Sequence, residues 1–222
     1  MIVDSLSASL EEKVFLTLEE EILAGELKKG EALAEIALSK RLGVSRTPIR
    51  GALHRLKEDG LVEIAPNKGA VVLGIDKNDL IDIYKVRNRL EGLASASAAK
   101  SISKEALDKL RESVELSEFY ISRGDTEKVK ELDTAFHLLI YKASGNRQLE
   151  SILTELHRKI KTYRKLSLSV SGRVEKSIAE HREILEAIEK GEAELADKLT
   201  SLHIERALEN LVVALAERES GQ

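Results

Sequence analysis

The sequence predicts a mainly α-helical chain in two parts. Residues 1–75 are expected to combine short helices with a β-hairpin, and residues 76–222 to form an all-helical bundle. Both prolines of the chain, Pro48 and Pro66, lie in the first third. After Pro66, apolar residues recur at spacings of three and four, which is the period of an amphipathic helix. Prolines therefore occur only in the first part, and helical periodicity dominates the second.

The composition is that of a soluble globular protein, with 42% hydrophobic and 33% charged residues. No segment reaches the roughly 18 consecutive apolar residues of a membrane span, and the N-terminus lacks a secretion signal, so we expect a cytoplasmic protein. Because cysteine is absent, any metal must be held by carboxylates and the five histidines. The low aromatic content of 3% argues against stacking on single-stranded nucleic acid.

The N-terminal part has the element order of a helix-turn-helix followed by a β-wing. Pro66, Asn67, Lys68 and Gly69 are residue types of a tight hairpin turn, and Ser45 is placed to cap the helix that follows it. The predicted elements are helices near residues 8–24, 34–42 and 46–59, a turn at 43–45, and strands at 62–65 and 70–73.

The helix near residues 46–59 lies in the most basic part of the chain. Residues 36–57 contain six basic residues and no acidic one, although the whole chain has a net charge of -4. The apolar residues of the helix share one face, so the opposite face is exposed. A solvated basic face is the alternative interpretation, but arginines at this position favour contacts with DNA phosphates and guanine edges. The predicted DNA contacts are Arg46, Thr47, Arg50, His54, Lys68 and Gly69.

The apolar spacing of the C-terminal part predicts six helices. Two of them are followed by a glycine in the position of a C-terminal cap, Gly145 and Gly191. Their expected ranges are 77–100, 104–123, 125–144, 147–166, 173–190 and 192–217.

Several polar residues lie on the apolar faces of these helices. Asp133 and His137 are four residues apart in one helix, and His181 and His203 occupy apolar stripes of two others. An inward carboxylate without a partner is costly, and a cation would relieve that cost. Each histidine could also be an ordinary core residue. One aspartate with three imidazoles is a ligand set suited to Zn, Ni, Co or Mn. His157 has a similar spacing, but a basic stretch follows it, so we expect it at the periphery.

Arg87 is a further inward residue, because it lies between Ile83 and Leu90 on the apolar face of its helix. A buried guanidinium requires a carboxylate partner. That partner is either a bound organic acid or an internal residue such as Glu91.

The first part resembles the GntR family of bacterial transcription regulators over about residues 8–75. The resemblance rests on Leu42 to Arg50, on Gly60-Leu61-Val62 and on Gly69 to Val72. Gly51 departs from the family pattern, which usually has an acidic residue there, and Ile36 departs from a frequent basic residue. A glycine inside a helix costs roughly 1 kcal/mol relative to alanine.

The second part resembles the FCD ligand-binding domain of FadR-type members of that family, over about residues 77–217. The resemblance rests on Asp133 to His137, on Ala143 to Asn146, on Glu180 to Ile188 and on His203. It implies a metal held by Asp133, His137, His181 and His203, a bound organic acid, and a homodimer on an inverted-repeat operator.

We therefore expect a DNA-binding regulator, most simply a repressor, and not an enzyme. Its operator affinity would respond to a small carboxylate bound at one divalent metal ion per chain, with Arg87 as an effector contact. The alternatives are the same regulator with a purely structural metal and, less simply, a metal-dependent hydrolase. No residue beyond the ligands is placed as a general base, which argues against the hydrolase.

Overall fold

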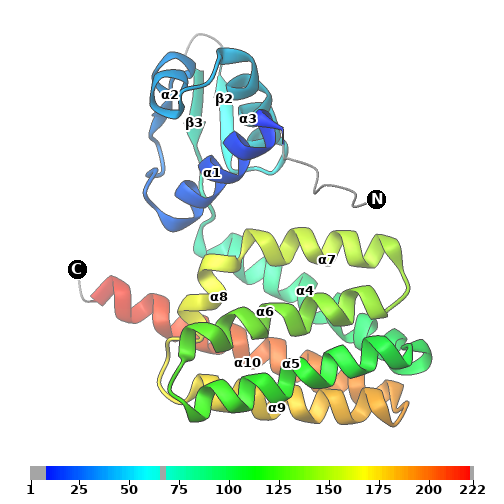
Figure 1. Cartoon of the computed structure of the whole chain (residues 1–222). Helices are drawn as coiled ribbons and strands as arrows, with labels where there is room; N and C mark the ends of the chain where they lie inside the picture. Colours follow the sequence, from blue (N-terminus) through cyan, green and yellow to red (C-terminus); the bar gives the residue numbers. More distant parts are fainter. Residues whose placement is uncertain (1–8, 66–68, 221–222) are drawn as a thin grey trace. The chain divides into compact units, whose positions relative to one another are not determined.

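A computed structural model describes residues 9–65 and 69–220 of the chain (Figure 1). The chain separates into two compact units, residues 1–77 and 78–222. Within the described ranges, no helix is long and apolar enough to cross a membrane.

The N-terminal unit is a winged helix-turn-helix. β3 is the central strand of an antiparallel sheet, with β1 on one side and β2 on the other, and α3 packs against α1 and α2. The elements are α1 (Leu10–Ala24), β1 (Ala32–Leu33), α2 (Glu35–Leu42), α3 (Arg46–Glu58), β2 (Val62–Ala65) and β3 (Gly69–Val72). The predicted fold class of this part is confirmed.

The packing of α3 explains why glycine is tolerated inside it. Ile49, Leu53 and Leu56 are buried on one face. Gly51 lies beside α1, where an added Cβ would stand 2.2 Å from Oε2 of Glu11. The missing side chain therefore leaves room for the Glu11 carboxylate against α3.

Three local predictions in this unit need correction. The strand β1 was missed, because two residues are too few to show an alternating pattern. The second wing strand spans residues 69–72 rather than 70–73. Ser45 occupies the position before α3, but its side chain makes no capping hydrogen bond.

The C-terminal unit is all-helical over its described residues, as predicted. Its helices are α4 (Lys77–Ser101), α5 (Lys104–Ser122), α6 (Thr126–Ala143), α7 (Arg147–Lys159), α8 (Lys161–Ser167), α9 (Arg173–Glu189) and α10 (Ala193–Ser220). α5 packs against α6 and α9, and α10 packs against α8 and α9 (Figure 1). Gly145 and Gly191, the predicted caps, have positive φ angles of 68° and 73°.

Small and large apolar residues from several helices form the core of this unit. Ala94 and Ala98 of α4 pack with residues of α6 and α9, including Phe136, Ile140 and Leu185. Gly92 of α4 leaves room for the Asp197 side chain of α10, because an added Cβ would overlap Oδ1 of Asp197. The core therefore holds α4, α6, α9 and α10 close enough for their polar side chains to meet.

The helix predicted over residues 147–166 is in fact two helices. α7 ends at Lys159 and α8 begins at Lys161, with the fully buried Ile160 between them. No proline or glycine marks this break, so the sequence pattern did not show it. The change of direction turns Arg164 of α8 toward the interior, where it is buried.

Candidate functional site

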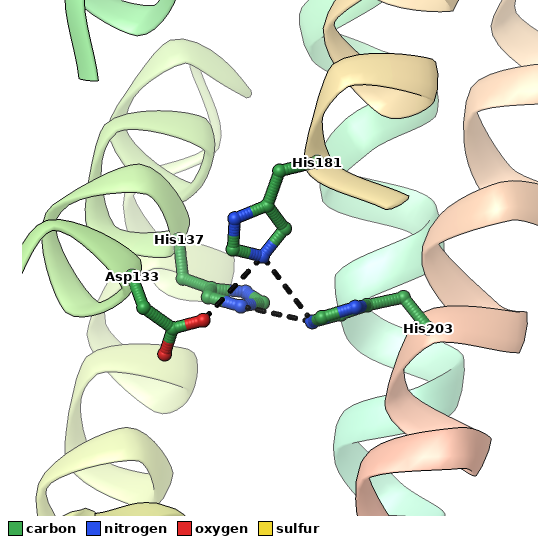
Figure 2. Close-up of side chains that lie close together, drawn as sticks. All are labelled: Asp133, His137, His181 and His203. Atoms are coloured by element: carbon green, nitrogen blue, oxygen red, sulfur yellow. Dashed lines mark hydrogen bonds and ion pairs between the residues drawn. The ribbon is translucent and has the colours of Figure 1, made fainter. Parts of the chain in front are cut away.

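Four predicted metal ligands lie together inside the helical unit (Figure 2). Asp133 and His137 project from successive turns of α6, His181 projects from α9, and His203 from α10. All four side chains are buried, and one ligand atom of each lies within 4.8 Å of the others. We refer to these residues as the Asp133–histidine cluster.

Two carboxylates outside this cluster fix the orientation of two of its rings. Nδ1 of His137 lies 2.7 Å from Oε2 of Glu91, and Nδ1 of His203 lies 2.6 Å from Oε2 of Glu180. Since an ionised carboxylate only accepts hydrogen bonds, each Nδ1 carries a proton and donates it. In its neutral form each ring then has the lone pair of Nε2 directed into the cluster. Carboxylates hold metal-ligating histidines in this way.

The distances inside the cluster fit a metal ion. Nε2 of His203 lies 3.3 Å from Nε2 of His137 and 3.4 Å from Nε2 of His181. With both rings in the neutral form, the facing lone pairs of His203 and His137 cannot form a hydrogen bond, and a cation between them would remove their repulsion. Nitrogen ligands bonded at ~2.0–2.1 Å to a tetrahedral ion lie about 3.3–3.4 Å apart. Both the donor types and their spacing therefore suit a divalent ion.

The protonation states of the cluster also suit a cation, because metal ligands must be deprotonated. Burial, followed by the nearby Arg164 cation, holds the pKa of His137 well below its usual value. Burial also lowers the pKa of His181 to about 3. Burial opposes ionisation of Asp133, but Arg164 and the surrounding rings hold the pKa of this carboxyl well below its ordinary range. At neutral pH the rings of His137 and His181 are therefore neutral, and Asp133 is a carboxylate.

Arg87, the predicted effector contact, is buried on α4 and lines a small cavity beside the cluster. Its Nη2 lies 2.5 Å from Oε1 of Glu91, which is the internal partner considered from the sequence. Within the described structure, Nε and Nη1 of Arg87 and the hydroxyl group of Tyr84 have no hydrogen-bond partner. The cavity has a volume of about 20 Å³, which is room for about one water molecule. Arg87 therefore has an internal ion pair and, beside the cavity, two unpaired donor groups.

His157 is not peripheral, and that prediction is wrong. Only 3% of its surface is exposed, because it continues the buried face that Leu149 and Leu153 begin on α7. Its Nδ1 lies 3.2 Å from the hydroxyl oxygen of Tyr141, and its ring contacts Arg164. The basic stretch that suggested exposure is divided by the break at residue 160. His157 lies next to the Asp133–histidine cluster but is not among its four members.

A second cavity lies between α6 and α8 and has a volume of about 290 Å³. It shares Asp133, Arg164 and Leu168 with the smaller cavity, and the exposed Lys161 also lines it. Arg164 forms an ion pair with Asp133. This ion pair therefore borders both the buried cavity and the larger one.

The N-terminal unit presents its predicted DNA contacts on the surface. Arg46, Thr47, Arg50 and His54 are all exposed on α3. Gly69 is exposed at the start of β3, whereas Lys68 lies outside the described residues. Both arginines donate to the carboxylate of Glu35, the first residue of α2.

Sequence reasoning missed the carboxylates that hold these groups. In the sequence Glu180 belongs to a family motif and Glu91 is a candidate partner of Arg87, whereas Glu35 carries no predicted role. A signal existed for Glu180, since it directly precedes His181. Glu91 lies far from His137 in the sequence, so only the packing of α4 against α6 brings them together.

The fold defines a class of protein: a winged helix-turn-helix, here with exposed arginines on its second helix, is a DNA-binding regulatory domain. Residues 10–72 match the gntR family of bacterial regulatory proteins, and residues 82–206 match the FCD domain. The chain belongs to this family, as its sequence motifs predicted. It is a transcriptional regulator and not an enzyme.

Relatives with curated names agree with this assignment. The chain is 34% identical over 198 residues to the HTH-type transcriptional regulator YdhC of Bacillus subtilis, covering 88% of each chain. It is 23% identical over 200 residues to the HTH-type transcriptional repressor RspR of Escherichia coli, covering 90% of this chain and 88% of that protein. The solved structure of E. coli McbR/YncC has a similar fold, with a TM-score of 0.73 at 24% identity, over 96% of this chain and 100% of that one.

Proposed function

We propose that this protein is a cytoplasmic repressor that binds an inverted-repeat operator as a homodimer and responds to a small organic acid at a divalent metal ion. The observation that carries the proposal is the convergence of His137 and His203 lone pairs with Asp133 beside the unpaired donors of Arg87. The family and the named repressor among its relatives support the DNA-binding part.

In this proposal α3 enters the major groove of the operator. Arg46 and Arg50 are four residues apart, so both lie on the same exposed face and reach neighbouring base edges. Thr47 and His54 share this exposed surface. Lys68 and Gly69 of the wing would contact the backbone.

Substitution of the recognition residues tests this part. The probe is a duplex that the wild-type protein selects from a random-sequence library. Arg46→Ala or Arg50→Ala is expected to weaken binding by about 1–3 kcal/mol and to relax sequence preference, while Lys68→Ala should weaken all duplexes alike and lower the salt slope by about 1. Glu58→Gln, on the same helix, is a matched surface control. Unchanged binding in all three variants would refute the assignment of this surface.

The metal part of the proposal assigns one divalent ion per chain to Asp133, His137, His181 and His203. Zn, Ni, Co and Mn all accept imidazole and carboxylate ligands. Such an ion would supply a positive centre, and one able to take five or six ligands would have positions left beyond these four for a carboxylate oxygen. Glu91 and Glu180 keep the rings of His137 and His203 oriented toward that position.

Elemental analysis of protein purified without a histidine tag tests the metal. We expect about one ion per chain in the wild type and its loss in His203→Ala. His157→Asn should retain the ion, because His157 is buried beside the cluster but outside it. Chelation should lower the melting temperature, since the ion binds only the folded state. Loss of metal from His157→Asn together with retention in His203→Ala would reverse the ligand assignment.

The effector part rests on Arg87 and the two cavities. The unpaired Nε and Nη1 groups of Arg87 are donors for an acid that approaches the cluster. The inner cavity of about 20 Å³ is too small for an acid, so its binding must enlarge this space. The adjoining cavity of about 290 Å³ is close to the lower end of ordinary ligand pockets, which favours a small acid.

Calorimetry with a panel of small mono-, di- and tricarboxylates tests the effector. Metal-stripped protein should lose acid binding. Arg87→Lys keeps a cation beside Glu91 but removes the guanidinium fork, so it should retain the metal and weaken the acid by roughly 1.5–3 kcal/mol. The acid and the selected duplex must change each other's affinity by the same factor. Equal acid affinity with and without metal would instead give the metal a purely structural role.

A further inference from the structure

The two arginines of the proposed recognition surface share a single carboxylate. Oε2 of Glu35 accepts hydrogen bonds from Nε and Nη2 of Arg46, at 3.2 and 2.8 Å. Arg50 donates through Nε to Oε1 and through Nη2 to Oε2, both at 3.1 Å. We refer to these three residues as the Glu35–arginine cluster. One acid at the start of α2 thus holds two long side chains of α3.

Glu35 stands at the edge of the basic region. No acidic residue occurs from Ile36 to Lys57, so Glu35 is the last acid before the recognition helix. Other arginines of this region pair with acids of α1, as Arg41 does with Glu21 and Arg55 with Glu12. Only the Glu35–arginine cluster involves the two residues that the proposed function assigns to base contacts.

The geometry of the cluster leaves part of each guanidinium available. An arginine has five N–H groups in a planar fork. Glu35 occupies the edge made by Nε and Nη2, so the end formed by Nη1 and the outer N–H of Nη2 points away from it. That end has the two parallel donors that match O6 and N7 of guanine. Glu35 can therefore remain bound while both arginines contact base edges.

The charge of Glu35 persists under all ordinary conditions. Hydrogen bonds from Arg50 and then Arg46 lower the pKa of Glu35 to about 2. The side chains of Arg46 and Arg50 are 56% and 58% exposed, so the cluster lies at the surface that would meet DNA. A permanent negative charge at this surface repels phosphates, whereas a base edge offers neutral acceptors.

We propose that Glu35 is a specificity-determining positioning residue of the DNA-binding surface. It orders both arginines for guanine contacts and makes their binding to phosphate alone less favourable. This inference rests on the proposed function, because it requires Arg46 and Arg50 to contact DNA. Fixing two flexible side chains in advance reduces the entropy lost on binding, and this gain applies only to the ordered, base-reading arrangement.

The test compares discrimination between two duplexes, one selected by the wild-type protein from a random library and one with the same composition in shuffled order. For Glu35→Gln, affinity for the shuffled duplex should rise about tenfold, with a salt slope steeper by about 1 because one anionic charge is lost. Affinity for the selected duplex should stay level or fall, since the arginines are less ordered. The ratio of the two affinities should therefore fall at least tenfold.

Glu58→Gln is the matched control, because it removes the same charge from an exposed position on α3. It should change both affinities by a similar factor and leave the ratio intact. Glu35→Asp keeps the charge, and it should recover part of the ratio. If the role of Glu35 were merely structural, Glu35→Gln would lower the melting temperature without changing the ratio of the two affinities.

The outcomes separate the two proposals. If Arg46→Ala and Arg50→Ala weaken the selected duplex but Glu35→Gln leaves the ratio unchanged or raises it, the role of Glu35 is overturned and the recognition surface stands. If the arginine variants bind both duplexes like the wild type, the recognition surface itself is wrong. A fall in the ratio for Glu35→Gln but not for Glu58→Gln supports the inference.

Discussion

The two units of the chain each contain a glutamate that binds two cationic or hydrogen-bonding partners, but in opposite surroundings. Glu35 pairs with Arg46 and Arg50 at the surface, where both arginines are more than half exposed. Glu91 pairs with Arg87 and His137 in the interior, where all three are 1–2% exposed. In water an ion pair is weak and exchangeable, whereas in the interior an uncompensated charge is very costly. The surface cluster can therefore be altered at little cost in stability, and the buried one keeps its side chains in place.

The largest effect is expected from removing the buried charge. Glu91→Gln leaves the Arg87 cation without an ionised partner and weakens the hydrogen bond to Nδ1 of His137, so it should cost about 3–5 kcal/mol of unfolding free energy. Metal affinity should also fall by about 10- to 100-fold, because a carboxylate that orients a ligand is lost. Denaturant unfolding and metal titration measure the two effects.

Glu112→Gln is the control for this variant. Glu112 is exposed on α5 in the same unit, and its substitution should change stability by less than about 0.5 kcal/mol. If the two variants were equally stable, burial would not distinguish the two kinds of cluster.

An intermediate effect is expected at the half-exposed pair between α1 and α3. Nη1 of Arg55 lies 2.5 Å from Oε2 of Glu12, both side chains are 37% exposed, and the guanidinium lies over the ring of Phe15. Glu12→Gln should cost up to about 1 kcal/mol, because solvent screens the pair and the Phe15 contact remains. Glu20→Gln on the exposed side of α1 is the control. Chemical denaturation measures the unfolding free energy of both variants. A loss of stability in Glu12→Gln as large as that in Glu91→Gln would contradict the predicted ranking.

The smallest effect on stability is expected at Glu35, and its pH dependence has a definite sign. The pKa of this carboxyl is lowered from 4.5 to about 2 in the folded state. Such a group stabilises the fold above its ordinary pKa, and this contribution is lost as the pH falls toward 2. The small difference in melting temperature between wild type and Glu35→Gln should therefore be larger at pH 7 than at pH 3. If the difference in melting temperature instead grew as the pH falls, a titrating group other than Glu35 would be responsible for it.

The residue pattern was sufficient to predict most of the architecture. The helix-turn-helix, the wing and the helical bundle follow from turn residues and from apolar spacing, which are local properties of the chain. The cluster of Asp133, His137, His181 and His203 was also predictable in part. Polar residues on apolar faces indicate an interior polar site, and the family motif indicates which of these residues are metal ligands.

Other features depended on contacts between distant segments. The break at Ile160 has no proline or glycine to announce it, and it determines that Arg164 faces inward. His157 was predicted outside because of its basic neighbours, yet its position on the face of Leu149 and Leu153 buries it. At His157 the local charge pattern conflicted with packing, and packing prevailed because it excludes water from this face of α7.

The sequence by itself determined which residue types are available for each chemistry and on which helical face they lie. Only the tertiary structure decided their partners: Glu91 with His137, Glu180 with His203, and Glu35 with both arginines of α3. Periodicity places a side chain on a face but carries no information on which residue of another helix it meets. That choice depends on how the helices pack and on which positions leave room, as Gly92 of α4 does for the Asp197 side chain of α10. Hydrogen bonds require distances near 3 Å, so these partnerships arise only after the helices have packed.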